Sequence, residues 1–134
     1  MRCIIYRLKE QQPDAMRIRF MNSNWLDGHG LWPIDPKRYG MLWSVCFPSP
    51  DGGNSEDLLE AIWRRCSQQC FREGFYSENY EKWWPSGAAY GLSVGDIVIL
   101  AETHPREDLQ EGAFFCDSIG FRFLGKQLSD EFPI

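Results

Sequence analysis

Cysteine and histidine are the residue types in this sequence that are best suited to metal binding or nucleophilic chemistry. The 134 residues include five cysteines and two histidines, and Cys66 and Cys70 are spaced by one helical turn. A zinc site needs about two further ligands near such a pair, and the remaining candidates are scattered. Because a free cysteine behaves as a small apolar side chain, the pair is typical of a helix face packed in a core. The sequence therefore predicts neither a metal site nor a cofactor.

The two histidines are the candidate general bases. His29 stands in the segment DGHG and His104 in the segment THP, with Asp27 and Glu102 close by in sequence. Either carboxylate could orient an imidazole for proton transfer. No serine elbow, zinc-binding helix or phosphate loop accompanies them, however. Surface-loop histidines are the favoured interpretation, so we expect no catalytic residue and no enzyme, and a small hydrolase is the weaker alternative.

Asp96 and Asp117 form the third chemical candidate, a carboxylate pair. Asp96 precedes an apolar run in SVGDIVILA, and Asp117 stands in FFCDSIGF. Both positions also suit turns, since aspartate favours the first position of a type I turn and glycine, here Gly120, the last. We therefore interpret both segments first as framework that starts or joins strands, and a carboxylate pair as the alternative.

The elements that must position these residues follow from hydrophobic periodicity. Alternating or continuous apolar runs bounded by turn residues predict strands, and the segment 11–14 predicts a turn. The fold class we expect is α+β, a small mostly antiparallel sheet of five or six strands with one main helix packed on it. The expected strands are Cys3–Glu10, Met16–Met21, Met41–Phe47, Ile97–Ala101, Ala113–Cys116 and Phe121–Leu124.

The main helix is expected to begin after Asn54 or Ser55, either of which can cap it, and to end near Gly74. Acidic residues occupy its first turn, where the helix dipole favours them. Its apolar residues recur at spacings of three and four, which is typical of an amphipathic helix. They are Leu58, Leu59, Ile62, Trp63, Cys66 and Cys70.

The strand at 97–101 is apolar at every position, which predicts that both of its faces are covered. The helix can cover one face. The aromatic segment Phe75–Tyr90, which includes Tyr80, Trp83 and Trp84, is a candidate for the other. Alternatively, some of these rings are exposed as a partner-binding platform, since tryptophan and tyrosine are common interface hot spots. Both interpretations stay open for the sequence.

Arginines near the start of the chain form a second candidate binding surface. Arg17 and Arg19 alternate in the expected strand 16–21, and Arg2 and Arg7 are nearby. Such a stripe could contact phosphate or an acidic partner, or form a solvated sheet face. The formal net charge of −5 and the pI near 5.0 argue against a dedicated nucleic-acid binder. A basic face with aromatic stacking therefore remains the alternative to a protein partner.

Cellular context follows from what the sequence does not contain. It shows no secretory signal and no apolar run of the roughly 20 residues that span a bilayer. Five cysteines cannot all pair within one chain, which is typical of a reduced compartment. We expect one cytoplasmic domain over residues 1–134, with no membrane partner.

Several of these segments together resemble the YodL-like domain family. From about Ile4 to Phe123, the order of the segments is similar to the order found in that family. The segments are RIRFM, PIDPKRYGMLW, SEDLLEAIW, GLSVGDIVIL and FFCDSIGF. Gly91 stands where the family usually has a serine at the start of its first turn motif. The tryptophan-rich segment from Trp83 to Tyr90 replaces a shorter, proline-containing segment that we would expect before this motif. The residues that match its two turn motifs are Leu92, Ser93, Gly95 and Asp96, then Phe115, Asp117, Ser118, Gly120 and Phe121.

The resemblance implies an accessory protein of a phage, plasmid or integrative element, without a catalytic activity to carry over. By analogy with such elements, we expect a non-enzymatic protein that binds a host protein complex, for example as an anti-restriction or anti-CRISPR inhibitor. The residues predicted to bind the partner are Tyr80, Trp83, Trp84, Arg17 and Arg19.

Overall fold

The computed structural model describes residues 2–46, 55–66, 75–85, 91–101 and 111–132. Several positions with sequence-based expectations lie outside these ranges, and the side chains of Ser55 and Cys66 are also outside the description. The positions outside the ranges are Phe47, Asn54, Cys70, Gly74, Tyr90, Glu102 and His104. The expectations for the helix cap, the helix end and the cysteine pair therefore stay predictions.

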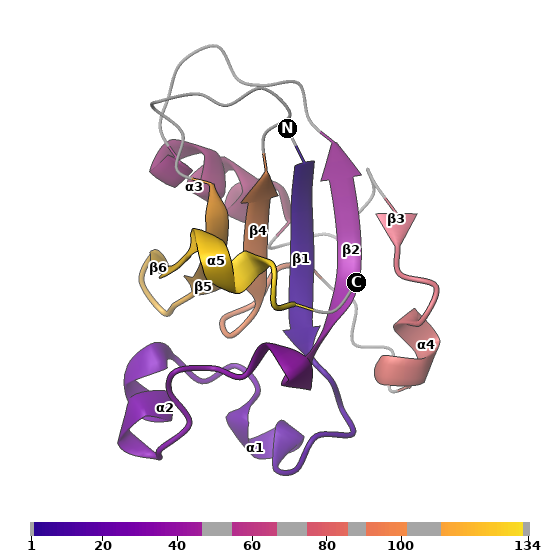
Figure 1. Cartoon of the computed structure of the whole chain (residues 1–134), viewed down its shortest axis with the longest axis vertical. Helices are drawn as coiled ribbons and strands as arrows, with labels where there is room; N and C mark the ends of the chain where they lie inside the picture. Colours follow the sequence, from indigo (N-terminus) through magenta and orange to yellow (C-terminus); the bar gives the residue numbers. More distant parts are fainter. Residues whose placement is uncertain (1, 47–54, 67–74, 86–90, 102–110, 133–134) are drawn as a thin grey trace.

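A six-stranded antiparallel sheet forms the centre of the protein (Figure 1). Its strand order is β3-β2-β1-β4-β5-β6, so β1 and β4 are interior strands and β3 and β6 are the edges. The expected α+β class is confirmed. The strands are β1 (Arg2–Leu8), β2 (Tyr39–Cys46), β3 (Phe75–Tyr76), β4 (Ile97–Ala101), β5 (Gly112–Cys116) and β6 (Phe121–Gly125).

Short helices surround the sheet. The longest in the described part of the chain is α3, with 12 residues, so the expectation of one main helix holds only approximately. None of the described helices is long and apolar enough to cross a membrane. The helical elements are α1 (Ala15–Ile18), α2 (Ser23–Gly28), the 3-10 turn η1 (Pro36–Arg38), α3 (Ser55–Cys66), α4 (Tyr80–Trp83) and α5 (Lys126–Ser129).

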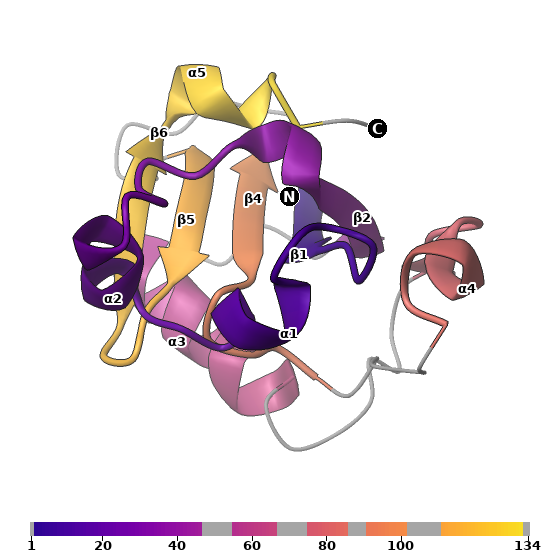
Figure 2. The same ribbon diagram turned by 90° about the horizontal axis from the view of Figure 1, so that it is seen from below.

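Both faces of β4 are covered, as its continuous apolar run predicts. Val98 and Leu100 belong to a buried cluster with Leu59 and Ile62 of α3 on one face. Ile97 and Ile99 belong to a second cluster on the opposite face. Figure 2 shows α3 on one side of the sheet and α5, with the segment leading to η1, on the other. Alternate residues of β4 thus supply two separate cores.

The second cover is not the aromatic segment, and that interpretation is wrong. The cluster around Ile97 and Ile99 is completed by the N-terminal helices, the segment near Ile34 and the C-terminal Phe132. Trp84 and its neighbours pack instead in the cluster that contains α3. The continuous apolar run of β4 predicts that its second face is covered. The segments that cover this face are distant in sequence and have no periodic apolar pattern of their own.

The expected strand 16–21 is also wrong, because this stretch forms α1 and a turn. Ala15 and Ile18 are both buried, a spacing of three that suits one face of a helical turn, whereas a strand would place them on opposite faces. Asp14 before the helix and Phe20 after it have φ angles of 58° and 69°, which interrupt an extended chain. Ile18 therefore points into the core while Phe20 is exposed.

Candidate binding site

The turn before β4 carries a buried ion pair between Asp96 and Arg7 of β1. Arg7 Nε donates to Asp96 Oδ1 at 2.8 Å and Arg7 Nη2 donates to Oδ2 at 2.7 Å. The same Nη2 donates to the carbonyl of Gly91 at 2.6 Å. The backbone amide of Ser93 also donates to Asp96 Oδ2, at 2.8 Å. Arg7 is only 1% exposed, so this pair joins the turn to the centre of the sheet.

The Arg7 guanidinium keeps its charge despite burial. Burial alone would lower the pKa of Arg7, but the charge and hydrogen bonds of Asp96 outweigh it, and the net result is a raised pKa. Two-point contact between a guanidinium and a carboxylate is among the strongest side-chain interactions. Each member depends on the other, because a lone buried charge is strongly destabilising.

Asp117 in the turn between β5 and β6 has a different structural partner. Its carboxylate accepts from the Ser23 amide at 3.0 Å and from the Ser23 hydroxyl at 2.5 Å. It also accepts from the Ser118 amide at 3.1 Å. Partial burial raises the pKa of Asp117, but the hydrogen bonds from Ser23 and Ser118 and the charge of Arg122 bring it below its ordinary value. The turn thereby holds the first residue of α2.

The two turn motifs meet at the end of β5. Gly95 N donates to the carbonyl of Cys116 at 2.8 Å, and Cys116 N donates to the carbonyl of Asp96 at 2.9 Å. Gly95 has φ of 94°, a conformation that favours glycine. Asp96 and Asp117 thus engage Arg7 and Ser23 respectively, rather than forming a carboxylate pair. Their role is to set the positions of β1, β5 and α2.

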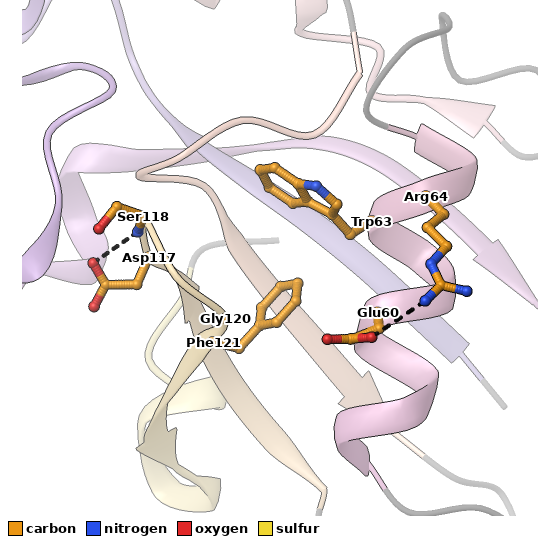
Figure 3. A pocket seen from close by; sticks show the side chains of 7 residues that line it. All are labelled: Glu60, Trp63, Arg64, Asp117, Ser118, Gly120 and Phe121. Carbon is orange, nitrogen blue, oxygen red and sulfur yellow. Dashed lines mark hydrogen bonds and ion pairs between the residues drawn. The ribbon is translucent and has the colours of Figure 1, made fainter.

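The second turn also forms one wall of an open pocket of about 340 Å³, which we call the Trp63 pocket (Figure 3). The opposite wall is α3, whose buried Leu59 and Ile62 fix it on the sheet. Pockets of this size are within the range that binds small molecules or side chains. The residues lining it are Glu60, Trp63 and Arg64 of α3 and Asp117, Ser118, Gly120 and Phe121.

Two aromatic rings form the apolar part of the Trp63 pocket. Trp63 and Phe121 are 6.2 Å apart between ring centroids at an interplanar angle of 85°, a favourable edge-to-face arrangement. Figure 3 shows Glu60 and Arg64 on the helix wall, where their ion pair spans 3.6 Å. The neighbouring turn residue Ile119 is 93% exposed. The pocket therefore combines two aromatic rings with a polar rim, and the turn that forms one of its walls carries an exposed aliphatic side chain.

The arginines predicted from the sequence are not on one strand face. Arg7 is buried in its ion pair, so the prediction that it belongs to an exposed arginine stripe is wrong. Arg17 lies on α1 with its guanidinium 5.7 Å from the ring centre of Trp25. Arg19 is half-buried and lies 4.7 Å from the ring centre of Phe20. Burial, then the charge of Arg7, lowers the pKa of Arg19.

The predicted aromatic site residues divide by burial. Trp84 is 1% exposed and its indole N–H donates to the carbonyl of Leu8 at 2.9 Å, so it belongs to the core and its assignment as a contact residue is wrong. Tyr80 and Trp83 are half-buried, and the ammonium of Lys9 lies 4.7 Å from a Trp83 ring centre. Figures 1 and 2 place α4 beside β2, at the end of the sheet opposite α2.

The described histidine and cysteines show no catalytic arrangement among the described residues. His29 is exposed, and its Nδ1 is 2.8 Å from the carbonyl of Trp25, on whose ring it stacks. Cys3 and Cys116 are buried, whereas Cys46 is exposed. No group of three or more histidine, cysteine, aspartate or glutamate residues in the described ranges could hold a metal.

The Trp63 pocket was not anticipated from the sequence. The helical spacing predicts Trp63 on the apolar face of the helix, and the sequence predicts Phe121 in an ordinary strand. The available signal was the position of Trp63 at the border of that face, directly before Arg64. A large ring at such a border is often partly exposed, but its neighbour across the pocket depends on tertiary structure.

The fold and this site define a small α+β protein with a surface pocket beside a sheet edge. The YodL-like domain family matches residues 2–126, and the chain belongs to this family. No curated protein and no solved structure matches the chain. The family assignment confirms the resemblance seen in the turn motifs, whose aspartates the structure places in the two networks described above.

Proposed function

We propose that this protein is a non-enzymatic binding protein that contacts a partner protein at the Trp63 pocket. The observation that supports this is the open pair of rings next to Ile119, which is 93% exposed. Single exposed apolar side chains are common, but here the exposed residue lies between Ser118 and Gly120, which both line the pocket. Tryptophan and arginine dominate interface hot spots, and the pocket has Trp63 and Arg64.

The polar groups of the two motifs support binding over catalysis. Arg7, Asp96 and Asp117 are engaged in contacts that hold strands and a helix in place. A general acid or base has to reach a substrate, and Arg7 and Asp96 are buried. These groups serve to position the pocket wall.

The biological setting we propose rests on the family resemblance. It implies a mobile genetic element such as a phage or plasmid, acting in the cytoplasm of its host. The partner would be a host protein complex, and the effect inhibition of a defence system, either restriction or CRISPR machinery. This step is an analogy at the level of the family.

Phage plating efficiency tests this function directly. Bacterial strains that carry a restriction or a CRISPR system should give more plaques when the wild-type protein is expressed. Ile119→Asp should abolish that gain without lowering the melting temperature, because Ile119 makes little contact with the core. The matched control is Phe75→Ser on β3, the opposite edge of the sheet, where the ring is 78% exposed.

Two results would contradict the proposal. An Ile119→Asp protein as active as the wild type would remove the pocket as the contact surface. Equal loss in both variants would indicate nonspecific apolar contact rather than a defined site. Trp83→Ala provides a third arm, since the half-buried Trp83 remains a predicted contact residue.

Nucleic-acid binding is the second candidate, because several arginines lie against aromatic rings. Arg122 lies 4.5 Å from a Trp32 ring centre, and Arg17 lies near Trp25. Such pairs can stack bases and contact phosphate. For a single-stranded oligonucleotide, the logarithm of the binding constant should then fall linearly with the logarithm of the salt concentration. Unchanged affinity from low to high salt, or no binding at low salt, would exclude this candidate.

A further inference from the structure

The two edges of the sheet differ in how much strand they present. β3 has two residues, and a very short edge strand is a common protection against pairing with other chains. β6 has five residues, FRFLG, without proline. Within the described residues β5 is the strand that pairs with β6. In the described part of the chain, the outer side of β6 is therefore the longer sheet edge with no strand paired to it.

The register of the β5–β6 hairpin shows which backbone groups point outward. Asp117 N donates to the carbonyl of Gly120 at 3.0 Å. In an antiparallel pair, hydrogen-bonded and non-hydrogen-bonded residue pairs alternate. The Cys116–Phe121 and Phe114–Phe123 pairs are therefore non-hydrogen-bonded. It follows that the backbone N–H and C=O groups of Phe121 and Phe123 point away from β5, while those of Arg122 point toward it.

The side chains of β6 differ on its two faces. Phe121 lines the Trp63 pocket, and Phe123 lies 5.1 Å from Phe114 between ring centroids on that same face. Arg122 is on the opposite face, against Trp32. Within the described residues, no carboxylate forms an ion pair with Arg122. The edge thus offers aromatic surface on one face and an exposed cation on the other.

We infer that the partner binds as an extended segment that adds to β6 as a further strand, an inference that rests on the proposed function of the Trp63 pocket. In strand addition, backbone hydrogen bonds give affinity, and alternate side chains give specificity. We assign the segment an antiparallel direction, in which the residues opposite Phe121 and Phe123 bond to their outward backbone groups and point their side chains toward the pocket face. The residue between them would lie opposite Arg122. The geometry selects a segment with the order apolar, acidic, apolar.

The experiment uses a phage-displayed library of random seven-residue peptides, selected on the full-length protein. Enriched peptides should carry the apolar–acidic–apolar order and lose binding to the Trp63→Ser variant. One enriched peptide is then synthesised with single backbone N-methyl groups. Methylation of either apolar residue should weaken binding about tenfold or more, because that N–H faces β6. Methylation of the central acidic residue should have little effect, since its N–H faces away.

Charge exchange at Arg122 provides the second measurement. Arg122→Glu should weaken binding of the acidic peptide about fivefold, and a peptide with lysine at the central position should bind this variant with the lost affinity restored. Arg64→Glu is the matched control on the pocket rim, where the recovery is not expected. Melting temperatures of all variants are compared with that of the wild type. If a variant fails to fold, the methylated peptides measured on the wild-type protein decide the outcome.

The outcomes separate the two proposals. Peptides that require Trp63 but tolerate methylation at every position would overturn strand addition and leave the pocket as the binding site. Selected peptides that are indifferent to Trp63, or no selected peptide, would overturn both. Periodic sensitivity to methylation together with recovery by the central lysine supports strand addition at β6.

Discussion

Replacing Asp96 by asparagine is the change that most directly tests the buried ion pair. The substitution keeps the size of the side chain and an oxygen for the Ser93 amide, but it removes the negative charge opposite Arg7. Arg7, 1% exposed, would then be a buried cation that has lost the carboxylate of its ion pair. Removing one partner of a buried pair costs about 3–5 kcal/mol, a large fraction of the roughly 5–15 kcal/mol by which domains are stable.

The expected change in melting temperature follows from the length of the chain. Unfolding entropy of about 2.1 cal/mol/K per residue predicts that 1 kcal/mol shifts the midpoint by about 3.6 °C for 134 residues. Asp96→Asn should therefore lower the midpoint by about 11–18 °C. Circular dichroism melts and urea titrations at pH 7 measure the midpoint and the free energy of unfolding.

A double-mutant cycle identifies the ion pair as the cause. Arg7→Met alone leaves Asp96 as an unpaired buried anion, whereas the double variant has neither charge. The double variant should be about 2–3 kcal/mol more stable than the sum of the single losses predicts. The matched control is Glu60→Gln, which breaks the exposed pair with Arg64 and should change stability by about 0.5 kcal/mol or less. Losses from Asp96→Asn as small as those of this control would refute the reasoning.

Three further predictions follow from the same structure. The lowered pKa of Asp117 means that its stabilising effect is fully present above the unfolded aspartate pKa of about 3.9 and is lost as pH falls through the lower folded value. Asp117→Asn should therefore reduce stability at pH 7 and flatten the loss of stability below pH ~4, as measured by urea titration; an unchanged pH profile would contradict it. Burial raises the pKa of the Cys116 thiol well above its ordinary value, so peptide mapping after native iodoacetamide labelling should find Cys46 modified rapidly and Cys116 only in denaturant. Trp84→Phe should destabilise the protein by about 1–3 kcal/mol, since it leaves the Leu8 carbonyl without its donor and shrinks a buried ring; a native melting temperature would show that the site tolerates the loss.

The strands with strong periodicity were predictable from the sequence. The apolar run Ile97–Ala101 indicates an interior strand by itself, and β4 has that place between β1 and β5. The glycines Gly95 and Gly120 mark the turns that precede β4 and β6. Both have positive φ, a conformation that favours glycine, so the residue type itself indicates the turn. These features depend on neighbouring residues, which a sequence displays directly.

Features that depend on distant residues were not predictable in this way. Arg7 is one of several arginines near the start of the chain, and its sequence context does not distinguish it from Arg17. Its burial depends on Asp96, which is 89 residues away. The Trp63 pocket likewise needs α3 and the β5–β6 turn to meet. The aromatic segment was ambiguous because it lacks a period, and tertiary contacts place Trp84 in the core.

The long separation between Arg7 and Asp96 has a consequence for the order of events during synthesis. β1 lies between β2 and β4 in the sheet, so the ribosome makes one neighbour early and the other about 90 residues later. At about 5–20 residues per second, β1 waits roughly 4–18 s for the strand that completes it. Throughout that interval Arg7 lacks the Asp96 carboxylate that its guanidinium contacts at two points in the folded protein. The nascent chain therefore cannot bury the Arg7–Asp96 pair or place β4 beside β1 before Asp96 leaves the exit tunnel.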